Sequence, residues 1–143
     1  MPFRYLADLA TADAAFEAFG TTVEEMFMAA AEATLGVMIE NPRSIACLEE
    51  ISFQVEEKSL ELLLFEFLQE LIYSKDARGI LPRVKNIRIE SGPSTLMLNA
   101  QACSIPLDQV RHRLLTDVKA VTFYKFAVEH LDGQWRATVV LDV

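Results

Sequence analysis

Apolar residues recur along this chain with two different spacings, and the spacing separates helices from strands. In residues 22–40 and 59–75 they return every three or four positions, so each segment predicts an amphipathic helix with a buried side. Thr21 and Thr22 are each followed three residues later by a glutamate, which predicts a capped start for the first helix. Gly79 predicts the end of the second helix.

Elsewhere apolar and polar residues alternate, as is typical of strands with one buried face. The predicted strands cover residues 3–6, 14–19, 51–56, 84–90, 95–103, 118–131 and 134–141. Asp132-Gly133 lies between the last two, and an Asp-Gly pair between alternating runs is a strong signal for a two-residue hairpin turn. Continued along both strands, this register predicts that Asp142 lies opposite Phe123.

The order of these elements is two strands, a helix, a strand, a helix and four strands, which predicts the α+β class. We expect a single domain over residues 1–143, with a mostly antiparallel or mixed sheet and two amphipathic helices packed on one face. No internal repeat, low-complexity tract or linker-like segment interrupts the chain. At 143 residues the chain can bury a core of its own without disulfides or a structural metal.

Acidic residues dominate the charge and exclude some partners. The formal net charge is −8 and the sequence pI is near 4.7. Because nucleic acids and anionic membranes are bound mainly through Lys and Arg, we expect no direct nucleic-acid or membrane binding. The N-terminal residues lack the pattern of a signal peptide, and the apolar run 26–31 is too short to span a bilayer. The expected location is the cytoplasm.

The two cysteines, Cys47 and Cys103, are far apart in the sequence and form no CxxC pair. Neither His112 nor His130 clusters with them. We therefore expect two reduced thiols in or near packed structure, and no zinc site.

Common catalytic signatures are missing, and carboxylates are the candidate functional groups. The patterns GxSxG, GxGxxG and GxxxxGK[ST] do not occur. Asp142 is followed by the terminal carboxylate of Val143, and Asp13 at the start of a predicted strand could add a third oxygen donor. Such a set suits Ca²⁺, Mg²⁺ or Mn²⁺. A simpler interpretation is an ion pair between Asp142 and Lys125, its diagonal neighbour in the predicted hairpin.

Four segments, in order along nearly the whole chain, resemble the archease family, the protein cofactor of the RtcB-type RNA-splicing ligase. These segments are Ala10-Thr11-Ala12-Asp13 with the strand after it, residues 65–72 with Asp76 and Gly79, residues 116–122, and Leu141-Asp142-Val143. Three positions differ from the common family pattern. Ala10 replaces a histidine, Asp117 replaces a glutamate, and Phe123-Tyr124 replaces Tyr-His.

The resemblance implies a divalent cation held by Asp13, Asp142 and the Val143 carboxylate. It also implies a non-catalytic activator that promotes ligase guanylylation and multiple turnover in tRNA splicing, while the ligase uses GTP and Mn²⁺ to join RNA ends. Lys119, His112 and Asp117 are candidates for the surface that contacts the ligase.

Two other functions fit the same carboxylates. In the first, the protein is a metal-dependent phosphoester hydrolase whose cation activates water. In the second, the cation is purely structural and ties the end of the chain to the loop that precedes Asp13.

Overall fold

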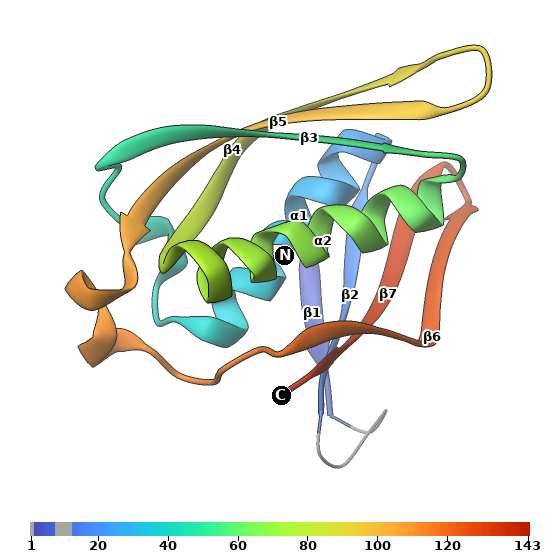
Figure 1. The fold of residues 1–143 in the computed structure, drawn as a ribbon. Coiled ribbons are helices and arrows are strands. Elements are labelled where there is room, and N and C mark those ends of the chain that lie inside the picture. The colour runs from blue at the N-terminus through green and yellow to red at the C-terminus, as the bar shows by residue number, and fades with distance from the viewer. Residues whose placement is uncertain (1, 8–12) are drawn as a thin grey trace.

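The computed structural model describes residues 2–7 and 13–143, and it confirms the predicted α+β class (Figure 1). Two α-helices and seven strands make up the described chain, together with short 3-10 turns that include η1 (Pro42–Ser44). In chain order these are β1 (Phe3–Leu6), β2 (Asp13–Gly20), α1 (Val23–Met38), β3 (Glu49–Glu57), α2 (Leu60–Arg78), β4 (Ile80–Ser91), β5 (Leu96–Pro106), β6 (Ala120–Leu131) and β7 (Gln134–Asp142).

The strands form two separate antiparallel sheets. One has the order β1-β2-β7-β6 and the other the order β3-β5-β4. Figure 1 shows both helices in the space between the sheets. Helix α1 packs against β2 and β4, and α2 packs against β3, β4 and β6. Each helix therefore contacts both sheets.

This position explains why the helices are apolar over more than one side. A helix covered from two directions needs a wider apolar surface than one that lies on a single sheet. Phe27 of α1 and Phe67 of α2 are fully buried, with ring centroids 6.1 Å apart. Neither helix in the described part of the chain is long and apolar enough to cross a membrane.

The helix ends follow the predicted signals. The Thr22 hydroxyl accepts a hydrogen bond from the backbone N–H of Glu25 at 3.1 Å, and the Glu25 carboxylate accepts one from the N–H of Thr21 at 2.8 Å. These bonds satisfy N–H groups that a helix start otherwise leaves unpaired. At the end of α2, Gly79 adopts a left-handed conformation with φ 63°, which residues with a Cβ disfavour.

The cysteines contradict the prediction of two reduced thiols, because Cys47 and Cys103 form a disulfide. Strand β5 lies at the centre of its sheet and carries the buried Cys103, while the exposed Cys47 lies in the loop before β3. Pairing of β3 with β5 draws this loop over β5, where Leu48 donates a backbone hydrogen bond to Ser104. The two Cα atoms are consequently 4.8 Å apart, within bonding range of a disulfide.

Removing the disulfide is expected to lower the free energy of unfolding by about 2–4 kcal/mol, because it closes a loop of 56 residues in the unfolded chain. Cys47→Ser is the preferred variant, since Cys47 is exposed and its replacement leaves no cavity. Urea denaturation with and without dithiothreitol measures the effect. Dithiothreitol should lower the free energy of unfolding of the wild type to that of the variant. An unfolding free energy of the wild type that does not change with the reductant would contradict the prediction.

Candidate acidic site at the end of strand β7

Asp142 ends β7, between the two strands that flank it. Its register partner is Asp13 in β2 on one side and Ala120 in β6 on the other. The backbone N–H of Lys119 donates to the carbonyl of Asp142 at 2.8 Å. Residues far apart in the sequence thus hold the end of β7 from both sides.

Alternation along β7 decides which face Asp142 occupies. Leu141 is fully buried in the core that contains the helices, and the side chain of Val143 also packs against this core. Because successive residues of a strand point to opposite faces, Asp142 belongs to the outer face of the sheet, and it is partly exposed.

The pairing of Asp13 with Asp142 brings together two of the three predicted cation ligands along the backbone. Residues directly opposite one another in an antiparallel pair have Cβ atoms about 4.5–5.5 Å apart, and like charges at such positions are destabilising. On the other side of Asp142, the register partner Ala120 carries no charge. The register thus places two acidic residues at adjacent backbone positions of this sheet end. Ala10, one of the departures from the family pattern, lies outside the described residues.

The predicted hairpin register is correct near the turn and wrong beyond it. Leu131 pairs with Gln134 as predicted, but between Thr122 and Ala127 strand β6 advances five residues while β7 advances two. This bulge moves Asp142 from Phe123 to Ala120. The predicted ion pair between Asp142 and Lys125 is also wrong.

Lys125 lies inside the bulge, with a left-handed φ of 53°. Its ammonium lies 5.6 Å from the centre of the Tyr124 ring. None of the ion pairs formed among the described residues joins it to Asp142.

The bulge presents aromatic side chains to solvent. Phe123 is 64% exposed and Tyr124 is 54% exposed, although both lie in the interior of a strand. The Phe123 ring stacks in parallel on Phe65 of α2 with centroids 3.9 Å apart, and Phe126 meets Phe65 edge-on at 5.6 Å. We call residues 123–126 the aromatic bulge. The sequence signal for it was the run of adjacent large apolar residues at 123 and 124, since a regular strand can bury only one of two neighbours.

Two side-chain hydrogen bonds, one from α2 and one from β6 itself, hold the start of β6. Gln69 accepts a hydrogen bond from the backbone N–H of Val121 at 2.6 Å. The Thr122 hydroxyl donates to the carbonyl of Val140 in β7 at 2.9 Å. Of the segments that carry the family resemblance, residues 116–122 are therefore in direct contact both with residues 65–72 and with the chain end.

A buried lysine makes a further tie between α2 and the segment before β6. Lys75 is only 6% exposed, and its ammonium lies 2.5 Å from Asp76 and 2.6 Å from Asp117. Burial alone would lower the pKa of Lys75, but the hydrogen bonds to Asp117 and Asp76 outweigh it and raise the pKa above its ordinary value. Asp117, predicted as a partner contact, thus has a structural contact to α2.

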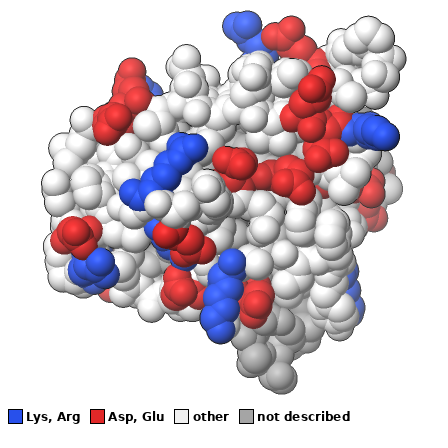
Figure 2. Space-filling view, in the orientation of Figure 1, with Lys and Arg blue, Asp and Glu red and all other residues white. Residues whose placement is uncertain are grey.

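The other predicted surface residues, Lys119 and His112, are exposed. Lys119 precedes β6, and His112 lies in a short 3-10 turn between two arginines. Arg111 bonds the nearby Asp108 at 2.8 Å, whereas Arg113 donates to the carbonyl of Glu40, distant in the sequence, at 2.8 Å. Figure 2 shows that acidic side chains gather over α2 on the face it displays.

The fold and the site define a small α+β domain in which two helices lie between two antiparallel sheets and acidic residues meet at one sheet end. The model of the archease protein family (MTH1598/TM1083) matches residues 3–143. The chain belongs to the archease family, as the resemblance predicted.

Relatives of known name and structure agree with this assignment. The chain is 37% identical over 134 residues to the archease of Thermococcus gammatolerans and 36% identical over 134 residues to that of Pyrococcus furiosus, covering 93% of this chain and 94% of each relative. The solution structure of Methanobacterium thermoautotrophicum protein 1598 superposes with a TM-score of 0.85 at 29% identity, covering 99% of both chains. An archease from Thermotoga maritima described as a "possible chaperone" shares the fold, with a TM-score of 0.62, 23% identity, and coverage of 94% and 93% of the two chains.

Proposed function

We propose that this archease is a non-catalytic activator of an RtcB-type RNA ligase, promoting its guanylylation and its multiple turnover in tRNA splicing. The observation that carries the proposal is that β2 and the start of β6 flank Asp142, while α2 contacts the start of β6. Strand β2, the start of β6 and the side chains of α2 all contact this sheet end or the residues that hold it. An activator needs a surface built from several elements rather than a catalytic pocket.

A divalent cation is part of the proposal, with Asp13, Asp142 and the Val143 carboxylate as its ligands. The donor set is all oxygen, which suits Ca²⁺, Mg²⁺ or Mn²⁺. Its fit rests on the register that opposes Asp13 to Asp142. When bound, the cation would neutralise the opposed carboxylates and fix the surface presented to the ligase. The described residues also bring Cys47 and Cys103 close to Glu50, but those sulfurs are bonded to each other in the other sheet.

The acidic character of the protein supports a role on the enzyme and not on RNA. A net charge of −8 disfavours phosphate binding and favours contact with a basic, RNA-binding partner. The ligase would perform the chemistry in the cytoplasm, with GTP and Mn²⁺, and the archease would leave the RNA to its partner.

The test of this proposal is a joining assay with the cognate ligase, GTP, Mn²⁺ and an excess of RNA ends. We expect close to one joined product per ligase without the archease and many with it. Equal product in both reactions would contradict the proposal. The alternative hydrolase is tested by incubating the archease alone with phosphoester substrates and Mg²⁺ or Mn²⁺, where the proposal predicts no turnover.

The aromatic bulge is expected to contact the ligase. Exposed aromatic residues held rigidly are typical of residues that dominate binding energy at interfaces. The double variant Phe123→Ala/Tyr124→Ala should raise the archease concentration needed for half-maximal stimulation at least about tenfold. Leu48→Ala is the control, because Leu48 is equally exposed but lies before β3, in the other half of the molecule. Equal potency of the double variant and the control would exclude the bulge from the interface.

A further inference from the structure

A cavity of about 480 Å³ lies between α1, η1 and β4, in a part of the molecule that the proposed function does not use. Its walls combine an apolar floor with a cationic rim. The floor consists of Met28, Ala31, Leu35, Pro42 and Val84, and the charged residues are Glu32, Arg43, Arg83 and Lys85. The size and the mixture of apolar walls with a few polar groups are typical of small-molecule sites.

The charge of this cavity is opposite to that of the protein. Three basic residues and one acidic residue line it, whereas the chain as a whole carries a net charge of −8. Two of the cations have carboxylate partners: Arg43 bonds Glu32 at 2.5 Å, and Lys85 bonds Glu50 at 3.0 Å. Glu32 is therefore already neutralised by Arg43.

Arg83 is the cation whose hydrogen bonds are incomplete. A guanidinium has five N–H donors. Among the described residues the Arg83 donors find one acceptor, the carbonyl of Ile45, at the long distance of 3.4 Å, and its Nε is buried with no partner. Buried polar groups without a partner are rare in folded proteins. Because the Nε itself is closed to solvent, the terminal N–H groups are the donors that a ligand in the cavity can reach. An arginine in this state beside an apolar floor suits a carboxylate or phosphate, which it can bind with two parallel hydrogen bonds.

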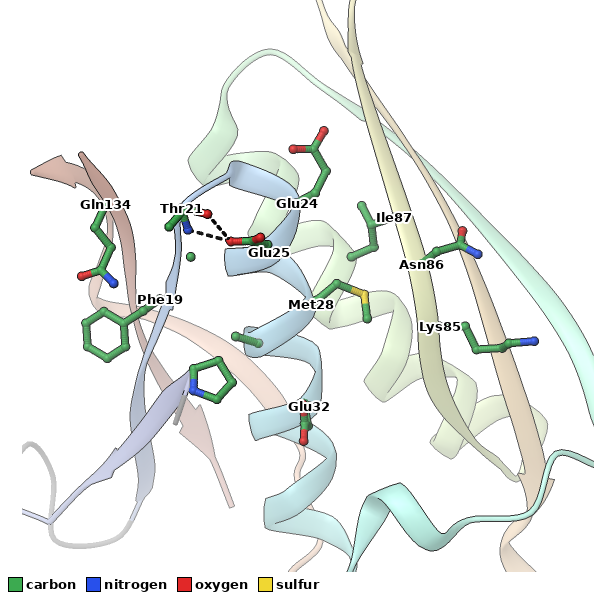
Figure 3. Close-up of a pocket in the computed structure, with 13 residues that line it drawn as sticks. Phe19, Thr21, Glu24, Glu25, Met28, Glu32, Lys85, Asn86, Ile87 and Gln134 are labelled. Atoms are coloured by element: carbon green, nitrogen blue, oxygen red, sulfur yellow. Dashed lines mark hydrogen bonds between the residues drawn. The ribbon is translucent and has the colours of Figure 1, made fainter.

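A neighbouring cavity has a lining of the opposite charge, so the basic lining is confined to the cavity around Arg83. Figure 3 shows this second cavity, of about 810 Å³, where Met28 of α1 points toward β4. It shares Met28, Glu32 and Lys85 with the first cavity, but Glu24 and Glu25 line it in place of the two arginines. The sign of the charge thus reverses along the groove between α1 and β4, and only the arginine end favours an anion.

We propose that the cavity around Arg83 binds a small organic anion, with a carboxylate or phosphate on Arg83 and an apolar body against Met28, Leu35 and Val84. The apolar floor excludes a fully hydrated inorganic ion as the best ligand, and the cationic rim excludes a neutral hydrocarbon. Binding here is independent of the ligase and of the cation at Asp142.

The experiment is a titration of ¹⁵N-labelled protein followed by amide chemical shifts. The probes are phenyl phosphate, hexanoate, hexan-1-ol and inorganic phosphate. We expect phenyl phosphate or hexanoate to shift the amides of Met28, Leu35 and Val84, and to bind at least about tenfold more tightly than hexan-1-ol or inorganic phosphate.

Arg83→Gln should lower the affinity for the tighter-binding organic anion at least about tenfold. Arg88→Gln is the matched control, because Arg88 lies on the same strand, is exposed, and is absent from the cavity lining. If Arg83→Gln fails to fold, Met28→Gln tests the contribution of the apolar floor. It should lower the affinity for the organic anions and leave the affinity for inorganic phosphate unchanged. Equal binding of hexan-1-ol, unchanged affinity in Arg83→Gln, or no shift with any probe would overturn the proposal.

Discussion

Under the proposed function, replacing Asp142 with asparagine is expected to abolish most of the stimulation of the ligase. The substitution keeps the size and one oxygen of the side chain but removes the charge that opposes Asp13 across β2 and β7. Because cation affinity at oxygen sites depends on the number of charged ligands, binding of Ca²⁺ or Mn²⁺ should weaken on the order of tenfold or more. Joined RNA per ligase and calorimetric titration with each cation measure the two effects, and Asp13→Asn should reproduce both.

Asp108→Asn is the matched control for this substitution. Asp108 is exposed and pairs only with Arg111 among the described residues, away from the end of β7. It should leave stimulation and cation affinity unchanged. Full stimulation by Asp142→Asn would contradict the assigned site. Asp142→Asn removes one of two like charges at paired positions, so the substitution itself should not destabilise the fold. A loss of stimulation without a lower melting temperature therefore excludes unfolding as the cause.

The second large effect is expected in the core, where Phe67→Ala should lower the free energy of unfolding by about 3–5 kcal/mol. Phe67 is fully buried on α2 and faces Phe27 of α1 between the two sheets. Its loss removes contacts in the one layer that both sheets share, and the surrounding helices cannot close over the cavity without moving a sheet. Equilibrium unfolding in urea measures the change.

Phe123→Ala is the control for Phe67→Ala, because Phe123 has the same side chain but is largely exposed on the aromatic bulge. Phe123→Ala should lower the free energy of unfolding by less than about 1 kcal/mol, because loss of the Phe123 ring exposes part of Phe65 but opens no internal cavity. Equal costs for the two substitutions would show that the helices are not the shared core of the two sheets.

Local patterns predicted most of the elements. Apolar spacing placed both helices within a few residues of their observed ends, and the cap at Thr22 and the stop at Gly79 occur as predicted. Alternation located all seven strands, although β4 starts earlier, at Ile80, and β6 starts later, at Ala120. These features depend on neighbours in the sequence, which is why periodicity detects them.

Features that depend on distant pairing were not predictable in this way. The division of the strands into two sheets follows from β3 pairing with β5, and the same pairing brings Cys47 to Cys103. The bulge in β6 changes the register of the hairpin by its own geometry, and no signal in the Asp-Gly turn reports it. The wrongly predicted reduced thiols arise from the first of these causes, and the wrong hairpin register and the wrong ion pair of Asp142 with Lys125 arise from the second.

The candidate site was partly predictable. The residue types and the family resemblance pointed to Asp13 and Asp142, and the register of β2 with β7 places these two residues opposite each other. The role of Asp117 was not foreseen, because its partner Lys75 lies on a helix and is buried only in the folded protein. The aromatic bulge was also missed as a surface, since its exposure results from an irregular strand.

The most direct test of the proposed function is the rate at which the ligase becomes covalently guanylylated from labelled GTP, measured with and without this archease before any RNA is added. The proposal predicts a rate that rises several-fold with wild-type archease and stays at the level of ligase alone with Asp142→Asn. The same rate with and without the wild-type protein would contradict it.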